Sequence, residues 1–517
     1  MLKSINQLKI GALLSYMQMA LSIIISLVYT PLMIRTLGQS EYGLYNTVSS
    51  TISMLSLLSL GFGSGYIRYY SIYKKEENNE KIYKLNGLFL IIFTIIGLIG
   101  LVCGLWLSNN LHFVFDKGLT VEEYSIARVL MLLLTVNLAL SFPMSVFSNI
   151  ISANERYIFL KLLGMLKTVG GPLVTIPILL MGYGSIALVA VTLAISVVTD
   201  ILYFIYVIFI LKNRFIFHGF EKGLFRNLFI YTSFIAINLV VDQINWNIDK
   251  LFLGRFQGTV SVAIYSVAYT IYQCCMTFST AISGVFAPRI HRIVNETIGN
   301  TSKRRLQLTN LFVKVGRIQF LLLGLIVSGI IFFGKPFIYF WAGEGYSEAY
   351  YVALLLIIPA TIALIQNIGV EIQRAEDKHQ FRSIAYLVMA CINLILTFFL
   401  CQKYGALGAA FGTAISLIVA NGIVMNFYYH KKCDIDIVLF WKNIIRLSIG
   451  LIPPIVFGVI IIKFINLYII WKLVVFICLY IVVYCISMWC IGMNKYERNL
   501  IQKPITAIFR RRYDKNS

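Results

Sequence analysis

The residues best suited to chemistry in this sequence are four polar side chains in an otherwise apolar stretch, residues 225–251. Asn238, Asp242, Asn245 and Asp249 are spaced i, i+4, i+7 and i+11. At about 100° per residue of a helix they fall within an arc of about 60°. Such a polar face could bind a coupling cation or hydrogen-bond sugar hydroxyls, or it could join neighbouring helices. The sequence leaves both roles open.

A second candidate is a pair of opposite charges, Lys167 and Asp200. Counted from the tight turn at Tyr183, the two residues lie at similar depth on adjacent antiparallel helices. We therefore expect them within one turn of each other. They would either neutralise one another as a structural pair or separate to take up protons or phosphate.

Four basic residues lie near the ends of apolar stretches: Arg35, Arg68, Lys250 and Arg255. Because the planar fork of a guanidinium matches phosphate oxygens, these residues are candidates for binding a pyrophosphate group. The structural alternative is that their charged ends simply reach the membrane surface.

Glycine and proline mark candidate hinges. Pro143 and Pro359 interrupt predicted helices at corresponding positions of two related halves of the chain, and Gly170, Gly171 and Pro172 break the helix predicted over 158–181. Interrupted helices in matching places point to the central site of a transporter, although packing also tolerates such residues.

The elements that carry these residues follow from the composition. Of 517 residues 59% are apolar and 13% are charged, with a mean hydropathy of +0.81. Soluble chains are about 45–50% apolar and about 25% charged. These values exclude a soluble enzyme, a disordered chain and a secreted disulfide scaffold. They indicate an all-α polytopic membrane protein.

A spanning helix needs about 20 mostly apolar residues. By that rule the chain has about fourteen spans, at approximately 10–33, 42–66, 85–108, 125–151, 158–181, 184–211, 225–251, 260–287, 311–333, 349–370, 383–402, 405–429, 437–462 and 465–492. The connections between them are too short for a separate soluble domain.

The charges of the connections predict how the chain crosses the membrane. With the N-terminus inside, 34 of the 44 Lys and Arg residues lie in the inner connections, nine lie in the outer ones and Lys167 lies within a span. The positive-inside rule then places both termini in the cytoplasm and explains the net charge of +22 without nucleic acid. The basic tail, residues 510–512, is expected to contact anionic membrane lipids.

The chain also repeats itself. The segment from Leu37-Gly38 to Tyr45 recurs from Leu253-Gly254 to Tyr265, residues 153–157 recur roughly at 375–379, and residues 183–186 recur at 404–407. The offsets of 216 to 222 residues indicate two six-helix repeats of the same orientation, followed by two further helices. The expected parts are an N-lobe (1–211), a C-lobe (212–429) and helices 13 and 14 with the basic tail (430–517).

Three segments resemble a known family. Residues 31–45 (PLMIRTLGQSEYGLY), 247–254 (NIDKLFLG) and 404–410 (YGALGAA) are similar to those of bacterial polysaccharide flippases of the O-antigen and capsule type. That family belongs to the superfamily of multidrug, oligosaccharidyl-lipid and polysaccharide exporters, and the resemblance extends over nearly the whole chain.

The resemblance implies a V-shaped, MATE-like transporter in the bacterial inner membrane. Its substrate would be an oligosaccharide linked to polyprenyl pyrophosphate, and its partners would be the proteins of polysaccharide assembly. The drive is left open among a coupling cation (a proton or Na⁺), the membrane potential and the substrate gradient. A multidrug or organic-cation antiporter of the same superfamily is the alternative.

A membrane glycan polymerase or ligase is a third alternative, which the sequence disfavours. The longest outer connection, about 109–124, has no recognisable set of catalytic carboxylates or histidines. The nine cysteines form no CxxC pair, and the five histidines lie in the connections. We therefore expect no enzyme, no cofactor and no metal centre.

Overall fold

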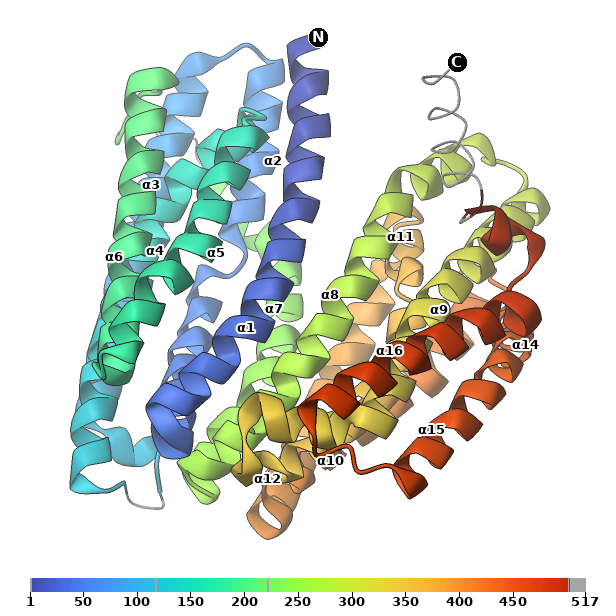
Figure 1. Ribbon diagram of the computed structural model, residues 1–517. Coiled ribbons are helices and arrows are strands. Elements are labelled where there is room, and N and C mark those ends of the chain that lie inside the picture. The colour runs from blue at the N-terminus through green and yellow to red at the C-terminus, as the bar shows by residue number, and fades with distance from the viewer. Residues whose placement is uncertain (1, 117–118, 221–222, 501, 503–517) are drawn as a thin grey trace, which may run out of the picture. The chain divides into compact units, whose positions relative to one another are not determined.

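The computed structural model of the protein describes residues 2–116, 119–220, 223–500 and 502 (Figure 1). All regular secondary structure in these residues is helical. The predicted all-α class is confirmed. The basic tail at 510–512, expected to contact anionic lipids, lies outside the described residues.

The helices of the first half are α1 (Leu2–Met54), α2 (Phe62–Lys75), α3 (Asn79–Asn109), α4 (Val121–Ala153), α5 (Tyr157–Leu180), α6 (Gly184–Ile205), α7 (Leu224–Phe256) and α8 (Thr259–Glu296). Those of the second half are α9 (Thr301–Ala342), α10 (Glu348–Ile365), α11 (Ile368–Ala375), α12 (His379–Leu417), α13 (Asn426–Lys431), α14 (Ile437–Ser448), α15 (Ile452–Phe464) and α16 (Ile470–Ser487). Short 3₁₀ or π segments connect or extend them: η1 (Leu55–Ser59), η2 (Leu111–Phe113), η3 (Tyr206–Ile210), η4 (Glu344–Tyr346), η5 (Ile418–Met425), η6 (Ile449–Leu451) and η7 (Met488–Gly492).

The number of spans is consistent with the fourteen expected. In the described residues, 11 helices are long and apolar enough to cross a membrane, or 12 if the bent helix α7 is included. One of them, Ile10–Lys75, has 66 residues, which at about 1.5 Å per residue is far longer than the roughly 30 Å of a bilayer core. It contains two expected spans, separated at Gly38, whose φ of 74° breaks the helix. Gln380–Lys431 likewise contains two, separated at Gly405.

The surface of these helices is apolar, as expected for contact with lipid. Val102, Leu173 and Phe399 are each 66% exposed, and Trp471 on α16 is 61% exposed. Continuous apolar surface of this kind is unfavourable in water and normal for a protein that has hydrocarbon as its solvent.

Local backbone conformation repeats about 220 residues apart. The left-handed residues Glu155, Gly184 and Lys212 have left-handed counterparts at Asp377, Gly405 and Asp434. Asn78 and Asn300 cap the starts of α3 and α9 in the same way, each accepting a hydrogen bond from the backbone N–H three residues later. Two of the three sequence echoes, 153–157 with 375–379 and 183–186 with 404–407, therefore have matching turns.

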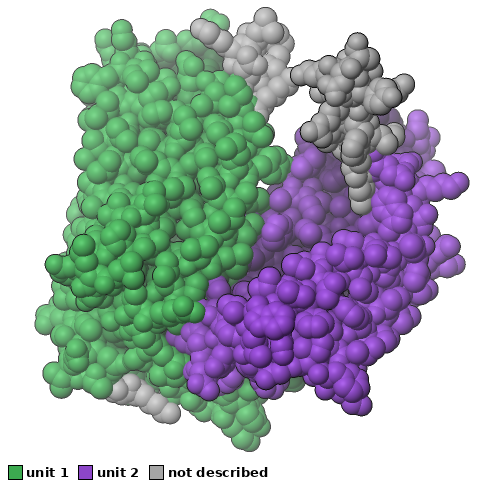
Figure 2. Space-filling view, in the orientation of Figure 1, with its two compact units in different colours: residues 1–270, 386–413 green, residues 271–385, 414–517 purple. Residues whose placement is uncertain are grey.

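The chain divides into two compact units (Figure 2). Unit 1 comprises residues 1–270 and 386–413, and unit 2 comprises 271–385 and 414–517. The boundaries predicted from the repeat, 1–211, 212–429 and 430–517, stay a prediction about lobes.

In unit 1, glycines bring α3 and α4 close together. An added Cβ at Gly97 would lie 2.6 Å from the carbonyl oxygen of Ala139, and one at Gly104 would overlap the side chain of Thr135. Small residues allow backbones to approach in this way, which is the usual means of helix association inside a membrane.

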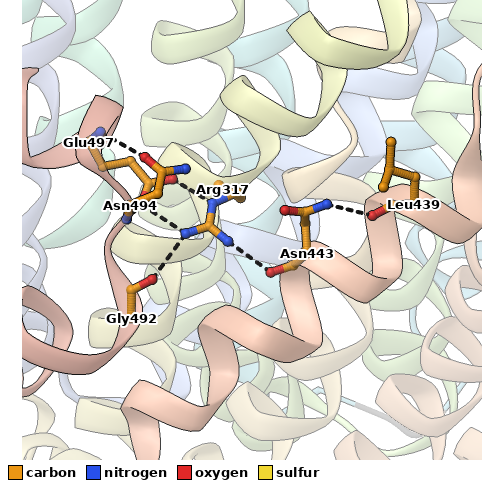
Figure 3. Close-up of polar contacts among 6 residues, drawn as sticks. All are labelled: Arg317, Leu439, Asn443, Gly492, Asn494 and Glu497. Carbon is orange, nitrogen blue, oxygen red and sulfur yellow. Dashed lines mark hydrogen bonds and ion pairs between the residues drawn. The ribbon is translucent and has the colours of Figure 1, made fainter.

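In unit 2, a buried ion pair joins α9 to the segment after η7 (Figure 3). The guanidinium of Arg317 donates to both carboxylate oxygens of Glu497, at 2.5 and 2.9 Å. It also donates to the backbone carbonyls of Asn443 on α14 and Gly492 on η7, each at 3.0 Å. Glu497 Oε2 in turn accepts from the backbone N–H of Asn494. We call this arrangement the Arg317 clasp.

Candidate functional site

The polar face predicted on α7 runs from an exposed end to a buried end. Asn238 and Asp242 are exposed, Asn245 is half-buried and Asp249 is fully buried. One helix thus carries a polar side chain on every turn from the protein surface into the core of unit 1.

Asp249 lies in a buried cluster of oxygen-bearing side chains. Its Oδ2 accepts hydrogen bonds from the hydroxyl groups of Tyr265, on α8, and Thr413, on α12, the latter at 2.9 Å. Asn393 Oδ1 accepts from Thr397 Oγ1 at 3.2 Å and from Thr413 Oγ1 at 3.4 Å. We call these five residues the Asp249 cluster.

Two polar atoms of the Asp249 cluster are left without hydrogen bonds. Within the described part of the chain, Oδ1 of Asp249 and Nδ2 of Asn393 are buried and have no partner. An unpaired buried carboxylate oxygen is costly, and it is stabilised when a cation or a proton binds to it. The carboxylate, amide and hydroxyl oxygens around it are the ligands that hard cations prefer.

Sequence reasoning found Asp249 but missed its partners as site residues. Tyr265 appeared there only as part of a repeated motif, and Asn393, Thr397 and Thr413 did not stand out. Threonine is ordinary in spanning helices, so no pattern along the chain singled these residues out. A weak signal was available at Asn393, a polar residue in the middle of an apolar span.

Lys250 is buried beside Asp249, but its ammonium group points to an aromatic ring. Its Nζ lies 4.4 Å from the centroid of Tyr269 on α8. A cation–π contact of this kind partly replaces the water that the ammonium group loses. Lys250 is therefore held within unit 1.

The other basic candidates lie apart from the Asp249 cluster. Arg35 is exposed on α1. Arg68 is exposed on α2 with its guanidinium 4.3 Å from the ring centroid of Tyr231. Arg255 lies 4.0 Å from Asp116 and donates to the backbone carbonyl of Phe113 at 3.4 Å. The structure therefore does not gather the predicted cations into one site.

Lys167 and Asp200 lie on the neighbouring helices α5 and α6. Lys167 is exposed and Asp200 is half-buried. Their charges interact, but no ion pair within 4.0 Å joins them in the described residues. The two residues are therefore neighbours, as expected, but they do not form the neutralising ion pair that was one of their two predicted roles.

The candidate hinge residues all lie inside continuous helices. Pro143 is within α4, Pro359 is within α10, and Gly170, Gly171 and Pro172 are within α5. The interruptions expected from the sequence are therefore not seen in the hydrogen-bonded helices. An added Cβ at Gly170 or Gly171 would meet no atom within 4 Å, so packing does not require glycine there. Their role as hinges stays a prediction.

A second polar network, which sequence reasoning missed, follows the break at Gly38. Glu41 Oε1 accepts from the backbone N–H and the hydroxyl of Ser185, at 2.6 and 2.5 Å, at the start of α6. Ser40 donates to Glu123 on α4 and forms a hydrogen bond of 2.9 Å with the hydroxyl of Thr259, at the start of α8. The segment after Gly38 thus ties together the starts of three helices of unit 1.

In the first repeat, a single hydrogen bond lies at the positions that correspond to part of the Asp249 cluster. Tyr29 OH and Thr175 Oγ1 lie 2.6 Å apart. They precede Asp249 and Thr397 by 220 and 222 residues, which are the offsets of the internal repeat.

Comparison with known proteins gives a consistent result. The sequence pattern of the polysaccharide biosynthesis protein family matches residues 9–294. The chain is 20% identical over 407 residues to a Shigella flexneri protein named as an O-antigen transporter, covering 78% of this chain and 92% of that protein.

Two solved structures have a similar fold. One is the lipid II flippase MurJ in an inward closed conformation, with a TM-score of 0.71 and 19% identity over 95% of this chain and 99% of that chain. The other is an inward-facing multidrug resistance MATE transporter, with a TM-score of 0.61 and 14% identity over 81% of this chain and 95% of that chain. These likenesses establish the fold, and because the family pattern covers more than half of its length, the chain belongs to the polysaccharide biosynthesis protein family.

Proposed function

We propose that the protein is a flippase for surface polysaccharide export. It moves an oligosaccharide linked to polyprenyl pyrophosphate from the inner to the outer leaflet by alternating access. Membership of the polysaccharide biosynthesis protein family carries this proposal. The names of its relatives support it, since one is named for O-antigen transport and a structural neighbour for flipping lipid II.

The proposed location is the bacterial plasma membrane, with both termini in the cytoplasm. The distribution of charge supports this orientation, because 34 of the 44 Lys and Arg residues lie in the connections assigned to the inner side. The proteins that assemble the polysaccharide on either side of the membrane are the expected partners.

A coupling cation, a proton or Na⁺, is proposed to drive the cycle. The Asp249 cluster supports this, because it places an unpaired carboxylate oxygen among amide and hydroxyl oxygens inside unit 1. The run at 329–335 (GIIFFGK) resembles a phosphate-binding loop, but Pro336 follows it in place of the Ser or Thr that such a loop needs. We therefore assign the drive to ion or substrate gradients rather than to ATP.

The pyrophosphate group of the substrate is proposed to contact Arg35 and Arg68. Both guanidinium groups are exposed on helices of unit 1, and the planar fork of a guanidinium matches phosphate oxygens. Lys167 and Asp200 remain candidates for a pair that changes its partners during transport. Arg255 is a weaker candidate, because Asp116 and Phe113 already contact it.

Multidrug or organic-cation antiport is the second candidate function. The specific observation in its favour is the fold similarity to a MATE transporter. The exposed Asp242 could also attract an organic cation, whereas the exposed arginines favour an anionic substrate.

Deleting the gene tests the proposal. We expect lipid-linked glycan to accumulate in the inner leaflet and surface polysaccharide to be lost, and we expect expression of the intact chain to restore both. Normal surface polysaccharide together with new sensitivity to cationic drugs would overturn the flippase assignment and favour the antiporter. The identity of the neighbouring genes gives an independent check, since glycosyltransferase neighbours are expected.

A further inference from the structure

Unit 2 contains a polar pocket between the end of α8 and the start of α9. Its volume is about 410 Å³, and it is lined by Arg289, Arg292, Ile293, Glu296, Gln307, Asn310, Leu311 and Lys314. Pockets that bind small molecules are typically about 300–1,000 Å³. We call it the α8–α9 pocket.

The polar side chains of the α8–α9 pocket form two matched faces. On each helix they are spaced i, i+3 and i+7: Arg289, Arg292 and Glu296 on α8, and Gln307, Asn310 and Lys314 on α9. Residues at this spacing share one face of a helix. Two polar faces therefore meet in one hollow, whose lining includes one apolar residue from each helix, Ile293 and Leu311.

The pocket has an excess of positive charge. It contains three cations and one carboxylate, and Arg292 is the cation nearest that carboxylate, with its Nε 4.0 Å from Glu296. Arg289, Gln307 and Asn310 make no side-chain hydrogen bond or ion pair with the residues that the structure describes. Their N–H groups are available to a ligand, and guanidinium, ammonium and amide donors together suit phosphate oxygens.

The Arg317 clasp helps to position the rim of this pocket. Lys314 precedes Arg317 by three residues on α9, and its Nζ lies 4.8 Å from the ring centroid of Tyr496. Tyr496 is adjacent to Glu497, which the clasp holds in place (Figure 3). The ordered C-terminal segment thereby limits the freedom of the Lys314 side chain, which lowers the entropy lost when Lys314 binds a ligand.

We propose that the α8–α9 pocket binds the phosphate group of a membrane lipid. The lipid is either the polyprenyl pyrophosphate carrier or an anionic phospholipid, and the two share the chemistry that the pocket recognises. The connection between α8 and α9 lies on the side that we propose to be cytoplasmic, where both lipids are present. The inference concerns equilibrium binding and does not require that the protein transports its ligand.

The test uses the full chain in nanodiscs of phosphatidylcholine that contain either polyprenyl pyrophosphate or phosphatidylglycerol. Bound lipid is counted by native mass spectrometry. The variant R289Q/K314Q removes two charges from the pocket, and the matched control K303Q/R305Q removes two charges from the first two turns of α9, outside it. Thermal unfolding without added lipid verifies that both variants fold.

We expect R289Q/K314Q to weaken phosphate-lipid binding about tenfold or more, while the control changes it less than about twofold. E296Q should strengthen binding, because it removes the only carboxylate that lines the pocket. R289K/K314R, which keeps both charges, should restore most of the affinity. The stronger of the two lipid arms identifies the natural source of the phosphate.

Equal losses in the pocket variant and the control would overturn the proposal, since general attraction to basic residues would then explain binding. No loss in either variant would overturn it as well. Because binding is measured without transport, a protein that binds phosphate lipid but fails to flip a glycan would contradict only the proposed function.

Discussion

At the scale of single residues, Asp249 is the side chain that we propose to bind the coupling cation. Replacing it with Asn keeps its size and its contacts with Tyr265 and Thr413 but removes the charge. We expect cation-driven transport in proteoliposomes to fall about tenfold or more, while the melting temperature is kept. The control is Glu344→Gln, an exposed carboxylate outside the site. Normal transport by Asp249→Asn would exclude a coupling role.

Gly43 gives a second prediction, about stability. A Cβ at this position would overlap the backbone carbonyl of Thr259, so Gly43→Ala must move the start of α8. We expect a loss of about 1–3 kcal/mol, seen as a lower melting temperature of the purified protein. The comparison is Gly170→Ala, whose Cβ would meet no atom within 4 Å. It should be neutral or stabilising by up to about 1 kcal/mol. Equal melting temperatures would show that α8 adapts freely.

The sequence could predict individual polar residues better than the sites they form. Asp249 was identifiable because a carboxylate is rare in an apolar stretch and because helical spacing placed it on one face. Asn393 and Thr413 lie 144 and 164 residues further along the chain. No local periodicity connects residues so far apart, and only the packing of α12 against α7 and α8 brings them together.

At the scale of elements, the Arg317 clasp holds α14 and the C-terminal segment against α9. Glu497→Gln leaves a buried guanidinium without its counter-charge, and such a loss costs about 3–5 kcal/mol. We expect a marked fall in the melting temperature of Glu497→Gln and of Arg317→Met. The double variant, Arg317→Met with Glu497→Gln, should lose less melting temperature than the two single variants lose together, because no unpaired charge remains in it. Additive losses would show that the two residues act independently.

The sequence predicted where one span ends and the next begins, because apolar composition sets the length of a span. It predicted bends within a helix less well, because these depend on local hydrogen bonding and packing. The breaks near Gly38 and Gly405 were expected, because two spans cannot fit into one helix. The prolines do not end a helix here, since α5 continues through Pro172, and their role as hinges stays a prediction. A proline in a long helix removes one backbone donor, and neighbouring hydrogen bonds can still carry the helix past it.

At the scale of the whole molecule, the proposed topology places Arg35 and Arg68 on opposite sides of the membrane. In a variant without the exposed native cysteines, Arg35→Cys should react with an impermeant maleimide added outside, and Arg68→Cys should react only after the membrane is opened. Both positions are exposed. Labelling of both from one side would contradict the topology and the proposed path of the substrate.

Cys433 can stay in that variant as an internal control. It lies between α13 and α14, and burial together with the nearby Glu376 carboxylate raises the pKa of its thiol to about 12. At pH 7 to 8 the thiol is protonated and unreactive. Labelling of Cys433 would therefore report unfolded protein rather than topology.

The matched turns and the hydrogen bond between Tyr29 and Thr175 have a consequence for the ancestry of the chain. At the repeat offsets of 220 to 222 residues, Tyr29, Tyr45, Gly171, Thr175 and Thr192 align with Asp249, Tyr265, Asn393, Thr397 and Thr413. Both copies keep a tyrosine and two threonines, yet only the later copy has the carboxylate and the amide. We infer that the two copies come from one gene duplication and now differ at this position, because only the second copy has a carboxylate that can bind a cation or a proton.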